Sequence, residues 1–181
     1  RIVSGSMSFD RQGHYQRVVD SGRIWLQVDL GQQRLKVRQG SQLVREYPIS
    51  SAAKGAGELH GSNRTPRGWH VIRAKIGDGA PSGAVFVGRR PTGEIYSEEL
   101  AQQHPDRDWI LTRILWLSGL ERGYNRLGNR DTMRRYIYIH GCPDSTPMGQ
   151  PGSAGCVRRR NADVIELFEQ VEPGTPVLIH E

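Results

Sequence analysis

Apolar and polar residues alternate with a period of about two along several short segments of the chain, which is typical of β-strands. On this basis we expect strands at 24–30, 35–37, 43–49, 69–76, 84–87, 110–117, 135–140 and 175–179. The turn residues at 31–33 join the first two segments into a predicted hairpin. The polar, glycine-rich segment 50–64 is expected to be a loop.

Helical periodicity is clear in one place, the segment 161–171. Its apolar residues recur at the spacing of one helix face: Val164, Ile165, Leu167, Phe168 and Val171. Asn161 is expected to cap this helix, and a second short helix is expected at 97–103. Many short strands with one or two covering helices predict a mainly β fold, either a β-sandwich or an open barrel.

Length and charge limit the classes of protein that fit. At 181 residues the chain is long enough for one well-cored domain and short for two. No apolar run approaches the roughly 18 residues that cross a bilayer. The net charge is +6 at pH 7, but the positive residues are scattered apart from 134–135 and 158–160, and no nucleic-acid-binding motif accompanies them. An acidic peptide is therefore a better partner than nucleic acid.

The first residues of the sequence bear on where the native protein starts and on its compartment. Residues 1–6 are expected to be an expression scar before a native start at Met7, and residues 7–181 to form a single domain. The residues after Met7 lack the apolar core of a signal peptide, so this start predicts a cytoplasmic protein. A removed leader replaced by methionine would leave the same N-terminus and predict a periplasmic protein.

One cysteine lies in a segment that can form a catalytic site. Cys156 follows Gly155, and the pair His140-Gly141 ends an apolar run 16 residues before the cysteine. A cysteine attacks carbonyl groups as the thiolate, so it needs a base or a nearby positive charge. His140 can take the proton, and the arginines at 158–160 can lower the thiol pKa. A backbone carbonyl near Gly141 can fix the imidazole tautomer in place of an acidic side chain.

Gly155 adds a second feature, because glycine lets the backbone approach a reacting group closely. The backbone N–H groups of Gly155 and Cys156 can then bind the oxygen of a tetrahedral intermediate. The alternative interpretation of the same residues is a buried, inert cysteine and a histidine with an ordinary structural role.

The residues around Cys156 resemble the signature of the L,D-transpeptidase catalytic domain (YkuD-type) family. The signature is a His-Gly pair, a loop, and Ser-x-Gly-Cys followed by Val or Ile and by Arg or Asn. The matching residues are His140, Gly141, Ser153, Gly155, Cys156, Val157 and Arg158. The turn at 65–68 and the helix start at 161–164 match the family too, and the resemblance covers roughly residues 24–179. It implies the family's β-sandwich or open-barrel-like catalytic fold, in which the cysteine loop and the His140 strand meet at one cleft.

The resemblance also implies an activity. A cysteine acyltransferase of this family cuts peptidoglycan stem tetrapeptides between the L-centred third residue and the terminal D-alanine. Cys156 would form a thioester, and His140 would protonate the leaving D-alanine. Transfer to an amine defines an L,D-transpeptidase, and transfer to water defines an L,D-carboxypeptidase acting on free muropeptides. Inhibition by carbapenems is implied as well, whereas no metal and no cofactor are expected.

Three further residues have candidate roles. Arg158 is expected to bind a substrate carboxylate, since a planar guanidinium suits that group better than lysine; otherwise it is a surface cation. Ser153 bonds within the cysteine loop or near the substrate, or is a simple turn residue. Tyr138 shares a strand face with His140, so it lines the cleft or packs in the core.

Two residues depart from the family signature. Many members have histidine where this chain has Ala154, which puts the rate and the acceptor in question. Many have threonine where this chain has Cys142. We expect Cys142 to be inert; the alternative is a disulfide with Cys156 under oxidation.

Two other classes of function remain compatible with the sequence. One is a metal site formed by His140, Cys142 and Cys156, with His70 or His104, although His-x-Cys lacks the paired spacing of structural zinc sites. The other is a non-catalytic module on the same fold that binds peptidoglycan peptides.

Overall fold

The computed structural model describes residues 8–181, in which ten strands join in one mixed sheet. The strands are β1 (Ile24–Asp29), β2 (Arg34–Gln39), β3 (Gln42–Pro48), β4 (Gly68–Ile76), β5 (Ala84–Val87), β6 (Arg90–Ile95), β7 (Ile110–Gly119), β8 (Tyr138–Gly141), β9 (Val157–Arg159) and β10 (Pro176–His180). The helices are α2 (Arg11–Asp20), α3 (Glu98–Gln103) and α4 (Asn161–Gln170), with 3-10 turns at Gly128–Arg130 and Met133–Arg135. The predicted scar at 1–6 and the start at Met7 lie outside the described residues. Within residues 8–181 no helix combines the length and the apolar content that crossing a membrane requires.

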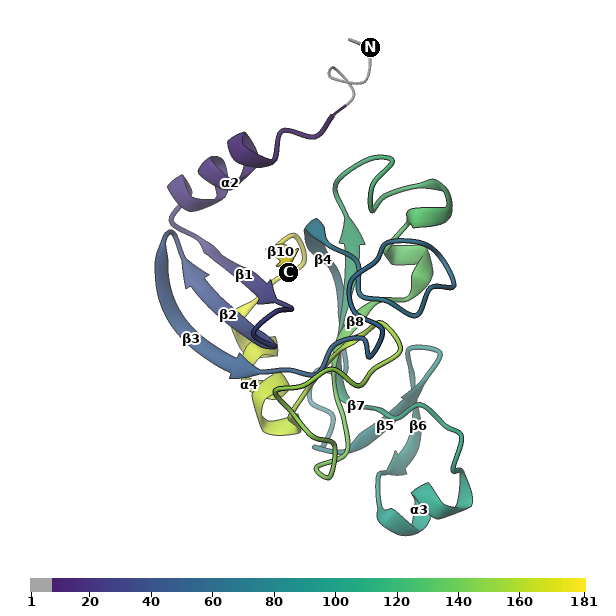
Figure 1. The fold of residues 1–181 in the computed structure, drawn as a ribbon. Helices are drawn as coiled ribbons and strands as arrows, with labels where there is room; N and C mark the ends of the chain where they lie inside the picture. The colour runs from purple at the N-terminus through teal and green to yellow at the C-terminus, as the bar shows by residue number, and fades with distance from the viewer. Residues whose placement is uncertain (1–7) are drawn as a thin grey trace.

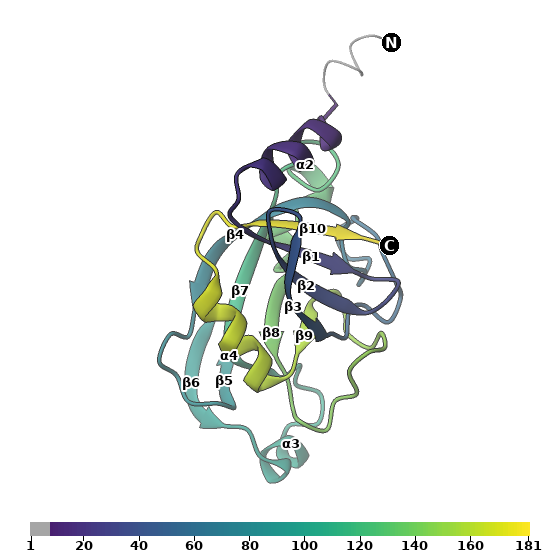
Figure 2. The ribbon, with the colours of Figure 1, turned by 90° about the vertical axis from the view of Figure 1, so that its left-hand side faces the viewer.

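The sheet is branched. Its strands hydrogen-bond in the order β3, β2, β1, β10, β4, β7, β5, β6, while β8 pairs with β7 and β9 pairs with β8. Figure 1 shows β1, β2 and β3 curving to one side of β4, β7 and β8. Figure 2 shows α4 lying across the β7 and β8 region, in agreement with its contacts to both strands. The prediction of a mainly β fold with few covering helices is confirmed.

The largest apolar core joins residues of β1, β2 and β3 to residues of β4, β7, β8, β9 and β10 and to one face of α4. Leu26 of β1, Leu115 of β7, Val157 of β9 and Phe168 of α4 all contribute to it. Each fully buried side chain of this size stabilises the fold by about 1.5–3 kcal/mol. The core holds one face of β8 and β9 in place, so the side chains on their other face have a rigid support.

Three elements were not predicted, because their apolar residues show no clear periodicity in the sequence. The helix α2 buries only Val18, the strand β6 is mostly exposed, and β9 is too short to show an alternation. The predicted strand at 135–140 begins only at Tyr138. The chain before it forms a 3-10 turn, and Tyr136 has a left-handed φ of 57° that ends this turn.

The expectation that Asn161 caps α4 is wrong. Arg160 occupies the cap position and makes no side-chain hydrogen bond there. The Asn161 side chain instead ties the helix start to β7 and the cysteine loop: Oδ1 accepts from Thr112 Oγ1 at 2.6 Å, and Nδ2 donates to Asp144 Oδ1 at 3.3 Å. The predicted short helix at 97–103 is confirmed as α3.

Candidate active site

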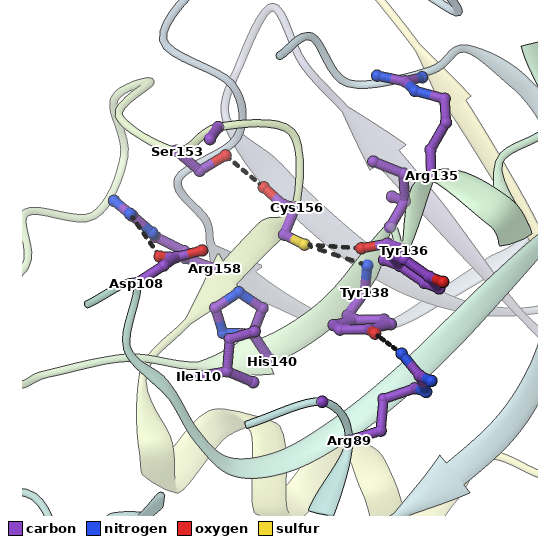
Figure 3. Close-up of a pocket in the computed structure, with 13 residues that line it drawn as sticks. Arg89, Asp108, Ile110, Arg135, Tyr136, Tyr138, His140, Ser153, Cys156 and Arg158 are labelled. Atoms are coloured by element: carbon purple, nitrogen blue, oxygen red, sulfur yellow. Dashed lines mark hydrogen bonds and ion pairs between the residues drawn. The ribbon is translucent and has the colours of Figure 1, made fainter. Parts of the chain in front are cut away.

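A cavity of about 550 Å³ opens beside Cys156 (Figure 3). Its walls come from β8, the cysteine loop, β9, the β5–β6 turn and the residues around the start of β7. The lining residues are Gly88, Arg89, Asp108, Ile110, Arg135, Tyr136, Ile137, Tyr138, His140, Ser153, Ala154, Cys156 and Arg158. Of the seven predicted site residues, five line this cavity, and the two glycines, Gly141 and Gly155, do not.

Parallel pairing of β8 with β9 brings the cysteine to the histidine. The register places His140 directly beside Arg158. Parallel neighbours need a long connection, and the loop 142–156 supplies it and ends on Cys156. Because side chains alternate along a strand, Tyr138 and His140 both face the cavity, while the residue between them packs in the core.

The thiol of Cys156 is held by two backbone groups (Figure 3). The Tyr138 N–H donates to Sγ at 3.3 Å, and Sγ donates to the Tyr136 carbonyl at 3.4 Å. Burial raises the pKa of the Cys156 thiol to about 12, although the Tyr138 N–H and the guanidinium groups of Arg158 and Arg135 act to lower it. The expectation of a low thiol pKa is therefore wrong for the free protein, in which the thiol is protonated at neutral pH.

The imidazole of His140 is fixed by the backbone and only 1% of the residue is exposed. Nδ1 lies 2.6 Å from the Gly141 carbonyl, so Nδ1 carries the proton and Nε2 keeps its lone pair. Burial lowers the pKa of His140, which keeps the ring neutral and able to accept a proton. Glycine follows the histidine because a Cβ at position 141 would collide with Asn161 Oδ1 and the Leu111 carbonyl.

Side-chain hydroxyl groups shape the cysteine loop. Ser153 Oγ donates to the Cys156 carbonyl at 2.5 Å and accepts from the Gly155 N–H at 3.1 Å. Thr65 Oγ1 donates to the Gly155 carbonyl at 2.9 Å. Gly155 has a φ of 132°, which L side chains rarely adopt. The hydrogen bonds of Ser153 thus stay within the loop and occupy the Gly155 amide, whereas the Cys156 amide has no hydrogen-bond partner among residues 8–181.

The three consecutive arginines after the cysteine face different surroundings. Arg158 lines the cavity, and its Nη2 lies 3.5 Å from Asp108 Oδ1. Arg159 is fully buried on the other face of β9, with its guanidinium carbon 4.1 Å from the ring centroid of Tyr47. Arg160 is exposed before α4. The expectation that all three assist the thiol is wrong, because Arg159 points to the opposite face of β9 from Arg158 and Arg160 lies beyond the end of the strand.

The cavity is also lined by three charged residues that were not predicted to belong to the site: Arg89, Asp108 and Arg135. Arg89 sits in the β5–β6 turn, donates from Nη1 to the Tyr138 hydroxyl at 3.0 Å and stacks on the exposed ring of Tyr136. No motif marks these positions: Arg89 and Asp108 come from loops distant from Cys156 in the chain, and Arg135 ends the 3-10 turn before β8. The guanidinium of Arg135 donates to the carbonyls of Gly57 and Arg64, so Arg89 and Arg158 are the cations that face the cavity. Two cations and one carboxylate leave the cavity positive, as suits an acidic peptide.

The remaining candidates lie away from this cavity. Cys142 is buried, its Sγ donates to the Arg159 carbonyl at 3.4 Å, and burial raises its pKa. Both cysteines are free. His70 is buried between the Gly68 carbonyl and Thr132 Oγ1. In the described part of the chain, no three His, Cys, Asp or Glu side chains converge as a metal site requires.

Comparisons with known proteins bear on the family and on the fold of the chain. The family model of the L,D-transpeptidase catalytic domain matches residues 23–179. A search of curated proteins finds no match. Among solved structures, an L,D-transpeptidase from Mycobacterium smegmatis is similar, with 17% identity, a TM-score of 0.52, and coverage of 88% of this chain and 59% of that one.

Two further structures have related folds. A Cys-to-Ser mutant of the Enterococcus faecium L,D-transpeptidase has 19% identity and a TM-score of 0.53, covering 87% of this chain and 50% of that one. An L,D-transpeptidase in complex with imipenem has 14% identity and a TM-score of 0.51, covering 87% and 58%. The chain thus spans about half to three fifths of the length of these proteins, and the likeness concerns the fold.

Proposed function

Because the chain belongs to the L,D-transpeptidase catalytic domain family, we propose that it is a cysteine acyltransferase acting on peptidoglycan stem tetrapeptides. Cys156 attacks the carbonyl carbon of the L-centred third residue, and the terminal D-alanine leaves. The acyl group then passes from the thioester to an amine, as in an L,D-transpeptidase, or to water, as in an L,D-carboxypeptidase.

One observation carries this proposal: Cys156 and His140 face the same cavity, and the backbone leaves His140 Nε2 as the basic nitrogen. A nucleophile needs a base within reach, and the base needs a fixed tautomer. Here the Gly141 carbonyl supplies the fixing group that an acidic side chain supplies in other hydrolases. The pair therefore has the elements of a catalytic dyad.

The resting state of the dyad is uncharged. The pKa of the Cys156 thiol is raised and that of His140 is lowered, both by burial, so neither group is ionised near pH 7. The thiol proton moves to Nε2 only as Sγ approaches the carbonyl carbon, after rotating away from the Tyr136 carbonyl. The same nitrogen then gives the proton to the amine of departing D-alanine.

The loop amides and Arg158 bind the substrate's oxygens. The Cys156 N–H donates to the oxyanion, and the Gly155 N–H joins it when it leaves Ser153 Oγ. Ser153 thereby holds the loop in place before substrate binds. Arg158 binds the carboxylate of the terminal D-alanine, and Tyr138 forms part of the cavity wall beside the thiol.

The acceptor depends on where the protein meets its substrate. A cytoplasmic chain would meet free muropeptides, for which hydrolysis to tripeptide is the useful reaction. A periplasmic chain would meet the cell wall, in which stem peptides offer amines. We propose that both reactions proceed from one thioester at Cys156.

Mass spectrometry of the products tests the proposal. The purified protein is incubated with a muropeptide tetrapeptide, with and without a free D-amino acid. Tripeptide reports hydrolysis, and a tetrapeptide with an exchanged terminal residue reports transfer. We expect Cys156→Ser to lower both rates by at least about 10³-fold, since the serine hydroxyl is a far weaker nucleophile in this setting.

Cys142→Ser is the matched control, because it changes the other thiol, which lies outside the cavity. It should keep the parent rates. A covalent adduct with imipenem gives a second readout, motivated by the imipenem complex of a structural neighbour, and should form in Cys142→Ser but not in Cys156→Ser. Turnover by Cys156→Ser at the parent rate would exclude the cysteine mechanism. Peptide binding by the parent without turnover or adduct would favour a binding module.

A further inference from the structure

Asp108 is the one carboxylate that lines the cavity among the described residues, and it faces an arginine (Figure 3). Its Oδ1 lies 3.5 Å from Arg158 Nη2, and the side chains are 57% and 23% exposed. An ion pair this accessible is weak, so either partner can exchange it for a charged ligand. The pair therefore presents a positive and a negative group side by side to any molecule that enters.

The pair stands at the histidine end of the cavity. His140 and Arg158 are direct neighbours in the β8–β9 register. Arg89 and the Tyr138 hydroxyl lie on the other side of Cys156 (Figure 3). The cavity thus has one end with paired opposite charges and another with a cation stacked on aromatic rings.

The proposed reaction places a particular group at the histidine end. His140 protonates the leaving amine, and it must deprotonate the incoming amine, so both amines pass the same nitrogen. The leaving D-alanine and a free amino acid acceptor each carry a carboxylate and an ammonium group on one carbon. The tetrapeptide itself differs, because its terminal residue has an uncharged amide nitrogen and offers Asp108 no cation.

We propose that Asp108 and Arg158 form a binding site for a free α-amino acid acceptor, with the carboxylate on Arg158 and the ammonium on Asp108. This inference rests on the proposed acyltransferase function. Arg158 serves donor and acceptor alike, since both have the terminal carboxylate. Asp108 favours the free amino acid alone, so it directs the thioester toward transfer and away from water.

The transfer step balances without another reactant. The bound ammonium loses one proton to water, because only the free amine has the lone pair that attacks. As the C–N bond forms, His140 Nε2 takes the second proton. As the C–S bond breaks, that proton returns to Cys156 Sγ, and the thiol is restored.

Asp108→Asn tests the inference, with Asp106→Asn as the matched control, since Asp106 is exposed and outside the cavity lining. The ratio of exchanged tetrapeptide to tripeptide is measured by mass spectrometry over a series of D-methionine concentrations. We expect the concentration for half-maximal exchange to rise about fivefold in Asp108→Asn, the loss typical of an exposed charge pair, and to stay unchanged in Asp106→Asn.

The ratio separates acceptor binding from chemistry. The Asp108 charge also acts on His140 and Cys156, but both groups serve hydrolysis and transfer alike, so a change in them moves both products together. A second test uses D-alaninamide, which lacks the carboxylate, as the acceptor. The parent should prefer a free D-amino acid over this amide, and Arg158→Gln should reduce that preference.

The outcomes distinguish the two proposals. A parent protein that forms neither product would refute the acyltransferase function and the acceptor site with it. A parent that hydrolyses but never exchanges would overturn the acceptor site and leave the cysteine mechanism standing. Exchange by Asp108→Asn with the parent's concentration dependence would also overturn it.

Discussion

His70 and His140 are both buried in the sheet, with 0% and 1% of the residue exposed, yet only one has the geometry of a base. In each ring Nδ1 lies against a backbone carbonyl, that of Gly68 at 3.0 Å and that of Gly141 at 2.6 Å. The rings differ at Nε2. The Nε2 atom of His70 is hydrogen-bonded to Thr132 Oγ1 at 3.0 Å. The Nε2 atom of His140 has no hydrogen-bond partner among residues 8–181, and His140 lines the cavity.

The comparison shows that burial alone does not make a histidine functional. Burial lowers the pKa of both rings and keeps both neutral. Two hydrogen bonds make His70 a structural cross-link between β4 and the chain before β8. One hydrogen bond and one free nitrogen leave His140 oriented but reactive.

Replacing each histidine with glutamine gives the largest expected difference between the two regions. His140→Gln should lower tetrapeptide turnover by about 10³-fold, because general acid and base catalysis is lost. His70→Gln should keep the parent turnover per folded molecule, while losing about 1–3 kcal/mol of stability from its buried hydrogen bonds. Initial rates and urea unfolding of both variants measure these effects. Turnover by His140→Gln within tenfold of the parent would remove the distinction.

Acid should separate the parent from His70→Gln. Burial holds the pKa of His70 at about 4, below the ordinary value of 6.5. The folded ring stays neutral while the unfolded chain takes up a proton, so the stabilisation from His70 is present above pH 6.5 and is lost as the pH falls toward 4. The loss amounts to about 3 kcal/mol.

Urea unfolding at pH 7 and pH 4 measures this loss. The parent should lose about 3 kcal/mol more than His70→Gln over that range. His140, whose pKa is also lowered, contributes to both proteins and cancels in the difference. If the parent and His70→Gln lost the same free energy of unfolding, the pKa of His70 would not be lowered in the folded protein.

The dyad could be predicted from sequence because its parts are local. A histidine at the end of an apolar run and a cysteine after a glycine lie on neighbouring strands joined by one loop. Alternation with period two correctly places Tyr138 and His140 on one face. The same rule, applied to 158–160, would have separated Arg158 from Arg159.

The rest of the cavity depends on tertiary structure. Asp108 and Arg89 come from loops that only the folded sheet brings beside Cys156, and no spacing in the sequence links them. The thiol pKa was also mispredicted, because nearby arginines are visible in a sequence and the burial that outweighs them is not. For the same reason the Asn161 cap was wrong, since Thr112 and Asp144 compete for its side chain.

Thiol labelling of the free protein tests whether His140 is neutral. Of the predictions made here, it is the one in which the His140 substitution should change the measured quantity least. A Cys142→Ala background leaves Cys156 as the only thiol. Because burial raises the thiol pKa to about 12, the thiolate fraction should increase tenfold per pH unit. The rate of iodoacetamide alkylation, followed by intact mass, should therefore rise about 30-fold between pH 7 and pH 8.5 without a plateau.

Adding His140→Gln should leave this slope unchanged, since a neutral imidazole does not stabilise the thiolate by charge. A plateau near neutral pH that disappears in His140→Gln would instead reveal a thiolate–imidazolium pair, and His140 would then differ from His70 in charge as well as in hydrogen bonding.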